Sequence, residues 1–168
     1  MSTWEKTKRN NMTYVGYSAI DYQDIKIYNE SDNDFPGYQT PGAAAFDIAS
    51  NETVLLEVGQ TSLVGTGLYF VLPECFMAEI TPRSSLGLRG ITLPNSPGVI
   101  DSDYRGEIKV ILTNLSDTPH IITKGDRIAQ VMVRPVIKPS LVSLSYLELQ
   151  DYNNTERGSN GFGSTGKN

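Results

Sequence analysis

The sequence predicts an all-β protein, a jelly-roll β-sandwich or barrel with one short helix. Short runs with strand character recur along most of the chain, separated by Gly, Pro, Asn and Asp. The run at residues 107–113 largely alternates polar and apolar side chains, and no comparable run has the period of a helix. Short strands joined by frequent turns are typical of β-sandwiches and barrels.

The expected strands start near residue 24 and continue to residue 133. In the run at 107–113, Ile108, Val110 and Leu112 fall on the same side of the strand, so we expect them to face the core. The full set of expected strands is 24–28, 53–58, 67–72, 76–81, 107–115, 120–123 and 127–133.

The one expected helix is a turn or two that follows Pro82. It would start at Arg83, Ser84 and Ser85, where the first backbone N–H groups of a helix have no intrahelical acceptor.

Composition predicts three regions. Residues 1–23 lack clear periodicity and form an N-terminal extension whose role the sequence does not reveal, and Met12 is an alternative start. Residues 24–151 form the β core. Residues 152–168 are rich in Asn, Gly, Ser and Thr, which cannot bury a core, so we expect a flexible C-terminal arm.

The overall composition excludes several classes of function. A net charge of −5 argues against a general grip on the nucleic acid backbone, which needs a basic face. No segment approaches 18 apolar residues, and residues 1–12 lack the apolar stretch of a signal peptide. We therefore expect no nucleic acid or membrane partner, and a cytoplasmic protein, or one of the host-cell cytoplasm if the source is viral. The single cysteine, Cys75, lies in an apolar run and is expected to be a buried thiol.

The C-terminal segment, residues 157–168, resembles an anion-binding loop. Residues 161–167 fit the start of a P-loop, but Asn168 follows the lysine and no helix completes the cradle. Glycines and hydroxyls still suit a phosphate, Arg157 offers a planar fork, and Phe162 suits stacking on a base. A low-complexity terminus without function is the alternative.

Two central segments carry candidate chemistry. Residues 82–87 combine Arg83, Ser84 and Ser85 in one turn, which suits a di- or triphosphate, although Ser84 acting only as an N-cap is the alternative. Residues 95–106 place Asp101 where a carboxylate can take a proton from water. Two alternatives remain for Asp101. It could bind a metal together with Asp103, or it could only satisfy backbone donors at the entry to a hairpin.

Two further segments are less informative alone. Within residues 42–48, a run of small residues leads to the acid Asp47. A purely structural role is the alternative for this segment. Residues 125–130 indicate a turn that leads into a strand, and an internal network between Asp126 and Arg127 is the expectation there.

In this order, the five segments resemble the five motifs of trimeric dUTP pyrophosphatases (dUTPases). The resemblance spans about residues 36–166 and implies a dUTP diphosphatase that yields dUMP and pyrophosphate, keeps uracil out of DNA and supplies dUMP for dTTP synthesis. It also implies a jelly-roll homotrimer with composite sites, in which the arm of one subunit closes over a site formed by the other two.

The resemblance assigns a role to each site residue. Asp101 resembles the aspartate that activates the water that attacks the α-phosphorus, with Asp47 as a supporting acid near phosphates and metal. The implied contacts are Arg83, Ser84 and Gln130 at the phosphates, Tyr104 at the deoxyribose, Asn95 and Phe162 at the uracil, and Arg157, Ser164 and Thr165 at the γ-phosphate. Ser85, Val99 and Gly163 are further implied substrate-binding residues. Magnesium is expected on the substrate phosphates and water, with no direct protein ligand.

The chain departs from the family pattern at Phe46, where many members have tyrosine, and Asn95 matches only one branch. A dCTP deaminase is the nearest alternative enzyme, but residues 88–94 contain no acid to act at the pyrimidine. A binding or regulatory protein is the alternative of another class. Intact Asp101, Arg157 and Phe162 favour catalysis.

Overall fold

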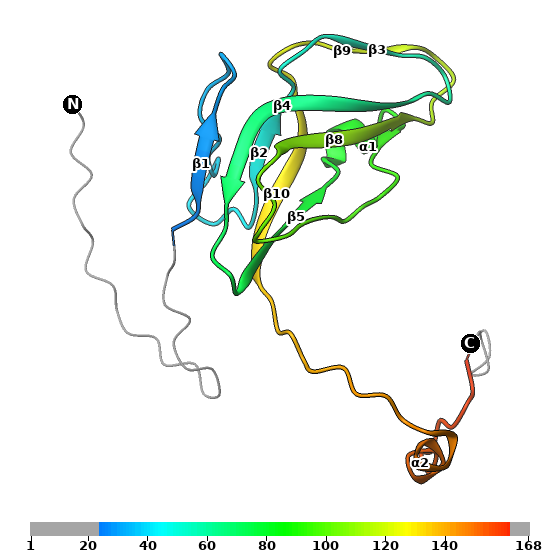
Figure 1. Cartoon of the computed structure of the whole chain (residues 1–168). Coiled ribbons are helices and arrows are strands. Elements are labelled where there is room, and N and C mark those ends of the chain that lie inside the picture. Colours follow the sequence, from blue (N-terminus) through cyan, green and yellow to red (C-terminus); the bar gives the residue numbers. More distant parts are fainter. Residues whose placement is uncertain (1–23, 162–168) are drawn as a thin grey trace. The chain divides into compact units, whose positions relative to one another are not determined.

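The computed structural model of the chain describes residues 24–161 (Figure 1). The chain divides between Val136 and Ile137 into two units, which are described separately. The first unit thus ends before residue 151, the expected end of the core. Residues 136–145 contain no helix or strand, so the β-sheets do not extend beyond this point of the chain.

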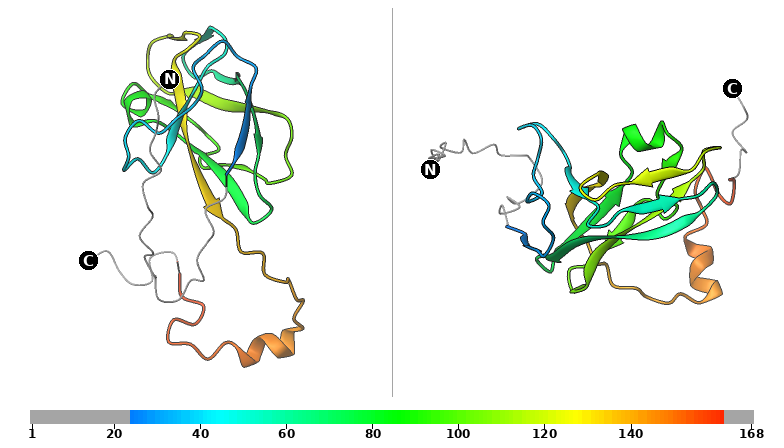
Figure 2. Two further views of the ribbon diagram at one scale, coloured as in Figure 1. Left: turned by 90° about the vertical axis from the view of Figure 1, so that its left-hand side faces the viewer. Right: turned by 90° about the horizontal axis from the view of Figure 1, so that it is seen from above.

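The first unit is built from antiparallel sheets, which confirms the all-β prediction. Figures 1 and 2 show the two larger sheets packed on each other. One sheet has the order β1-β4-β8-β6 and the other the order β2-β10-β5-β7, and β3 pairs with β9. The strands are β1 (Lys26–Asn29), β2 (Phe46–Ala49), β3 (Val54–Leu56), β4 (Thr61–Val71), β5 (Phe76–Thr81), β6 (Ile91–Thr92), β7 (Gly98–Ile100), β8 (Glu107–Asn114), β9 (His120–Ile122) and β10 (Arg127–Pro135).

One hydrophobic core lies between these sheets. As predicted, Ile108, Val110 and Leu112 of β8 are buried in it. Phe70 of β4 and Ile48 of β2 join the same cluster from opposite sheets. Fully burying an aliphatic or aromatic side chain of this size stabilises a fold by about 1.5–3 kcal/mol. Because alternate residues of a strand point to opposite faces, burying one set in the core leaves the other set on the outer face of each sheet.

Several strands differ from the sequence prediction. Strands β2, β6 and β7, of two to four residues each, were not expected. Strand β4 starts at Thr61 rather than at residue 67. Its pairing with β8 shifts register between Gly65 and Leu68, and Gly67 has φ of +69°. Such a bulge interrupts the alternation that sequence reading relies on.

The expectation of a buried Cys75 was wrong, because the side chain is exposed. Strand β4 ends at Val71 and β5 starts at Phe76, so Cys75 lies in the connection. The Phe76 amide donates to the Pro73 carbonyl across that turn. The apolar run therefore consists of two strands and a surface turn.

The second unit contains a helix that was not expected, so the prediction of a single short helix was wrong. Helix α2 (Tyr146–Asp151) starts with a capping box, in which Ser145 Oγ accepts from the Glu148 amide and the Glu148 carboxylate accepts from the Ser145 amide. The Ser145 amide and the Ser145 hydroxyl both donate to the Glu148 carboxylate, and these hydrogen bonds hold the pKa of Glu148 below its ordinary value. The spacing of Ser145 and Glu148 was the available sequence signal. Neither helix in the described residues is long enough to cross a membrane.

Asn114, at the end of β8, is a polar residue fully buried in the first unit. Its amide group donates to the carbonyls of Leu56 and Thr118, and its side-chain oxygen accepts from Ser116. It thereby joins β8 to β3 and to the turn that leads to β9.

Replacing Asn114 with alanine removes these bonds and leaves buried carbonyls without donors. We expect Asn114→Ala to lower the free energy of unfolding by about 2–4 kcal/mol. Urea denaturation measures the change. Asn153→Ala is the matched control, because Asn153 is exposed and bonds only to nearby Gln150. Equal stability of the two variants would contradict this role for Asn114.

Candidate active site

Three adjacent strands bring together segments that are far apart in the sequence. Gln130 of β10 is the register partner of Asp47 on β2 and of Thr81 on β5. Register partners share a face of the sheet, so these side chains form a row on its outer face. The candidate segments at 42–48, 82–87 and 125–130 therefore meet within one chain.

Asp47 is the centre of this cluster. One carboxylate oxygen, Oδ1, lies 2.9 Å from Arg83 Nε, and the other, Oδ2, accepts a 2.9 Å hydrogen bond from Arg127 Nη1. Arg83 Nη1 also donates to the main-chain carbonyl of Arg127, at 3.0 Å. The Asp47 side chain is only 14% exposed, so solvent screens these contacts less than at an open surface. One acid thus links two guanidinium groups.

This arrangement corrects the expected network between Asp126 and Arg127. Arg127 pairs with Asp47, eighty residues earlier in the chain. Asp126 instead accepts from the Thr123 amide and closes the turn before β10. Local sequence places the two charges side by side, but the turn points them to different partners.

The short helix after Pro82 is confirmed as α1 (Ser84–Gly87). Its N-cap residue is Arg83, in extended conformation, and no side chain caps the helix. The alternative in which Ser84 is the N-cap is therefore wrong. Ser84 and Ser85 are exposed in the first turn. Gln130 Nε2 donates to the Pro82 carbonyl at 3.0 Å, which ties this turn to β10.

Asp101 lies in a separate turn between β7 and β8. It is exposed, and its carboxylate has no hydrogen bond or ion pair with residues 24–161. The Tyr104 amide donates to the Asp101 carbonyl, and the Tyr104 hydroxyl donates to the Glu107 carbonyl at 3.1 Å. A Cβ at Gly106 would collide with the end of the Tyr104 side chain, which would then have to move. The turn therefore fixes Tyr104 and leaves the Asp101 carboxylate available.

Asn95 and Val99 line a small pocket beside this turn. The pocket holds about 60 Å³ and is also lined by Gly98 and by core residues such as Ile80 and Leu93. Val99 and Asn95 are exposed at its edge, and a Cβ at Gly98 would approach Asn95 Nδ2 to 3.2 Å.

The two halves of the candidate site lie at opposite ends of β5. Asp101 follows Ile100, which pairs with Ala78 near the start of β5, whereas Arg83 follows the end of that strand. Six residues of extended chain separate these positions, which corresponds to about 20 Å at roughly 3.3 Å per residue. Asp101 and Arg83 of one chain therefore cannot touch the same phosphate.

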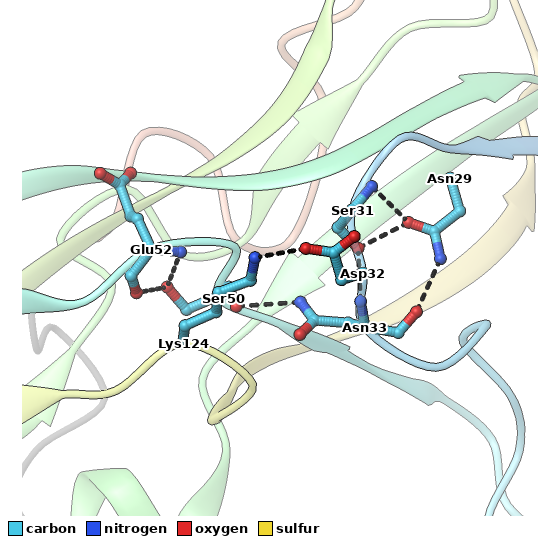
Figure 3. Close-up of polar contacts among 7 residues, drawn as sticks. All are labelled: Asn29, Ser31, Asp32, Asn33, Ser50, Glu52 and Lys124. Atoms are coloured by element: carbon cyan, nitrogen blue, oxygen red, sulfur yellow. Dashed lines mark hydrogen bonds and ion pairs between the residues drawn. The ribbon is translucent and has the colours of Figure 1, made fainter.

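A larger pocket adjoins Asp47 and Arg127. It holds about 510 Å³, and residues 31–37 form one wall. That loop is held by its own polar contacts (Figure 3): Asn29 Oδ1 accepts from Ser31, and Asn33 Nδ2 donates to the Ser50 carbonyl. Lys124 pairs with Asp32 at 2.9 Å and holds the pKa of that carboxyl below its ordinary value. Sequence reasoning missed this wall, because residues 31–37 carry no local motif, and it paired Arg127 with Asp126 rather than with Asp47.

The remaining candidates lie in the arm. Arg157 is exposed in the second unit, and its Nε donates to the Asn160 carbonyl at 3.0 Å. Phe162, Gly163, Ser164 and Thr165 fall outside the described residues. Within the described ranges, no three His, Cys, Asp or Glu side chains are grouped so that they could hold a metal ion.

Comparison with known proteins gives a consistent result. The sequence profile of the dUTPase family matches residues 31–166. The deoxyuridine 5'-triphosphate nucleotidohydrolase of Nautilia profundicola is 47% identical over 133 residues, which cover 79% of this chain and 90% of that protein. The protein of the same name from Brucella melitensis biotype 2 is 41% identical over 160 residues, which cover 92% and 99%.

Solved structures show the same fold. A mutant dUTPase of Staphylococcus bacteriophage 80alpha with dUpNHpp superposes with a TM-score of 0.77 at 23% identity, covering 87% of this chain and all of that one. A mutant dUTPase from phage phi11 of S. aureus, described with a structural Mg(II) ion, has a TM-score of 0.68 at 21% identity and covers 73% and 97%.

Proposed function

Because the chain belongs to the dUTPase family and is a dUTP nucleotidohydrolase, we propose that it attacks the α-phosphorus with a water activated by Asp101. Asp101 takes a proton from the water, and the water oxygen bonds to the α-phosphorus. The bond between the α-phosphorus and the oxygen that bridges it to the β-phosphorus breaks, and that oxygen leaves with the pyrophosphate. The products are dUMP and pyrophosphate. This reaction would keep uracil out of DNA and supply dUMP for dTTP synthesis in the cytoplasm.

The observation that carries the proposal is the free carboxylate of Asp101. A general base must accept a hydrogen bond from the attacking water, and a carboxylate whose two oxygens are both held by arginines is poorly placed to accept it. Asp47, the other acid of the candidate site, is held by two arginines. Asp101 has no such partner among the described residues and lies beside Tyr104, which suits a nucleoside sugar.

The separation of Asp101 from Arg83 supports a composite site. Both groups must lie at the phosphate chain of one dUTP, yet they lie at opposite ends of β5. A site with both therefore takes Asp101 from one subunit and Arg83 from a neighbour. We propose a homotrimer, in which each pair of subunits forms one of three equivalent sites.

In this site the nucleoside lies against Asn95, Val99 and Tyr104 of one subunit. The phosphates lie against the neighbour's α1 turn, where Arg83 supplies charge and Ser84 and Ser85 supply hydroxyl and amide donors. Gln130 supports the phosphate side through its bond to the Pro82 carbonyl.

The arm completes the proposed site. Arg157, Ser164 and Thr165 would hold the γ-phosphate, while Phe162 would stack on uracil with Gly163 beside it. The described part of the arm supports this role, because Arg157 and Gly158 lie in an exposed turn, where Gly158 has φ of +52°. A segment without a core of its own can close over a bound substrate at low structural cost.

We propose that a magnesium ion is held chiefly by the substrate phosphates and water. The Asp47 carboxylate, the acid expected nearest the phosphates, already lies between the two cations Arg83 and Arg127. Magnesium commonly keeps several waters and binds through substrate phosphates with few protein ligands. When bound, the ion would neutralise phosphate charge that repels the nucleophile.

The reaction is tested by incubating the full chain with magnesium and a panel of nucleoside triphosphates. We expect dUTP alone to be consumed, with dUMP and pyrophosphate identified by phosphorus NMR and mass spectrometry. The Asp101→Asn variant should be at least 1,000-fold slower, on the order of the loss of a general base. Orthophosphate release, conversion of dCTP to dUTP, or full activity of the variant would contradict the proposal.

The composite site is tested by mixing two inactive variants. Asp101→Asn retains Arg83, and Arg83→Ala retains Asp101, so a mixed trimer has one intact site. Random assembly from equal amounts makes three-quarters of trimers mixed, so about one quarter of wild-type turnover per chain should return. As a control, each variant alone is taken through the same denaturation and refolding. Absence of recovery in confirmed mixed trimers would contradict a site shared between subunits.

A further inference from the structure

Arg127 is the residue of the Asp47 cluster to which the sequence gave no role at the substrate, only an expected network with its neighbour Asp126. Its side chain is 49% exposed, and it holds Asp47 Oδ2 at 2.9 Å. It comes from the start of β10, where a bulge shifts the register between Arg127 and Ala129. The bulge lets both the Arg127 side chain and its carbonyl reach the cluster, while Ile128 stays in the core.

Two separate nitrogens of Arg83 depend on this arrangement. Arg83 Nε lies 2.9 Å from Asp47 Oδ1, and Arg83 Nη1 donates to the Arg127 carbonyl at 3.0 Å. A guanidinium is planar, so fixing Nε and Nη1 fixes the direction of the whole group. The plane of the Asp47 carboxylate is fixed in turn by Arg127 at its second oxygen.

We propose that Arg127 is a positioning residue for Arg83. It occupies one oxygen of Asp47 so that the other holds Arg83 in a single orientation, directed at the phosphate of the substrate. Without the Arg127 side chain, the Asp47 carboxylate is free to rotate and to take Arg83 in a fork-to-fork pair, which removes the guanidinium from the phosphate. This role rests on the proposed function, in which Arg83 binds phosphate.

Strand β10 offers a matched control for this proposal. Arg134 is also about half exposed and also pairs with a mostly buried acid, Glu79, at 2.7 Å. The Arg134 pair lies seven residues further along β10, away from Arg83 and Asp47. Arg134→Gln removes the same charge from the same strand but leaves the Asp47 cluster intact.

The test measures binding of a non-hydrolysable imido analogue of dUTP, with magnesium, by calorimetry, together with inhibition by deoxyuridine. We expect Arg127→Gln to raise the Kd of the analogue about tenfold, the effect of losing one charge-assisted contact. Inhibition by deoxyuridine, which has no phosphate, should not change. Arg127→Lys should recover part of the affinity, because its ammonium can pair with Asp47, and Arg134→Gln should bind like the wild type.

The decisive comparison is made in an Arg83→Ala background. If Arg127 acts through Arg83, adding Arg127→Gln to that background leaves the Kd of the analogue unchanged. A further tenfold loss there would overturn the proposal, as would wild-type binding by Arg127→Gln or an equal loss in Arg134→Gln. Equal melting temperatures of Arg127→Gln and the wild type would exclude unfolding as the cause of weaker binding. If Arg127→Gln does not fold, Arg127→Lys is used in its place. Failure of the proposed function differs, because Arg83→Ala alone would then bind the analogue as tightly as the wild type.

Discussion

The ion pairs of Asp47 are the interaction on which the proposed phosphate side of the site depends. A single carboxylate, mostly removed from solvent, lies between Arg83 and Arg127 and joins β2 to β10 and to the turn after β5. A cation at an exposed position contributes little, whereas partial burial strengthens each contact. Asp47 lies on the outer face of β2, since its neighbours Phe46 and Ile48 face the core, and Arg83 and Arg127 contact its two carboxylate oxygens. The hydrophobic alternation of β2 thus places the acid where the two arginines can reach it.

The same sheet supports the proposal that the site is shared between subunits. Strand β5 carries the proposed phosphate-binding turn at one end and pairs with β7 near the other, and β7 leads into Asp101. The length of β5 separates Asp101 from Arg83, and the packed core makes this spacing rigid. On the proposed nucleoside side, the Tyr104 hydroxyl is held by the Glu107 carbonyl within the chain. Association of subunits would then join two rigid half-sites, which requires little rearrangement on binding.

Sequence reasoning predicted the parts of the fold in which local pattern and burial agree. Residues 107–113 alternate and form β8, and residues 76–81 form β5 with the expected limits. It failed where the pattern is broken by backbone geometry. The Gly65–Gly67 bulge concealed half of β4, and the turn at Cys75 was hidden in an apolar run. Helix α2 was missed although Ser145 and Glu148 formed a readable capping box.

The candidate site shows the same division. Arg83, Asp47 and Gln130 were found because each lies in a recognisable segment, and the structure brings these three together. Arg127 was assigned to its neighbour Asp126, since sequence shows adjacency along the chain but not a partner eighty residues away. That pairing depends on the register of β2 and β10 and on the bulge in β10, neither of which is encoded by a short motif.

The position of water attack tests the central claim most directly. Hydrolysis of dUTP by the magnesium-loaded protein in ¹⁸O-enriched water places one labelled oxygen in a product, and mass spectrometry identifies which. Attack at the α-phosphorus predicts the label in dUMP and unlabelled pyrophosphate. Label in pyrophosphate, with unlabelled dUMP, would show attack at the β-phosphorus and would contradict the account.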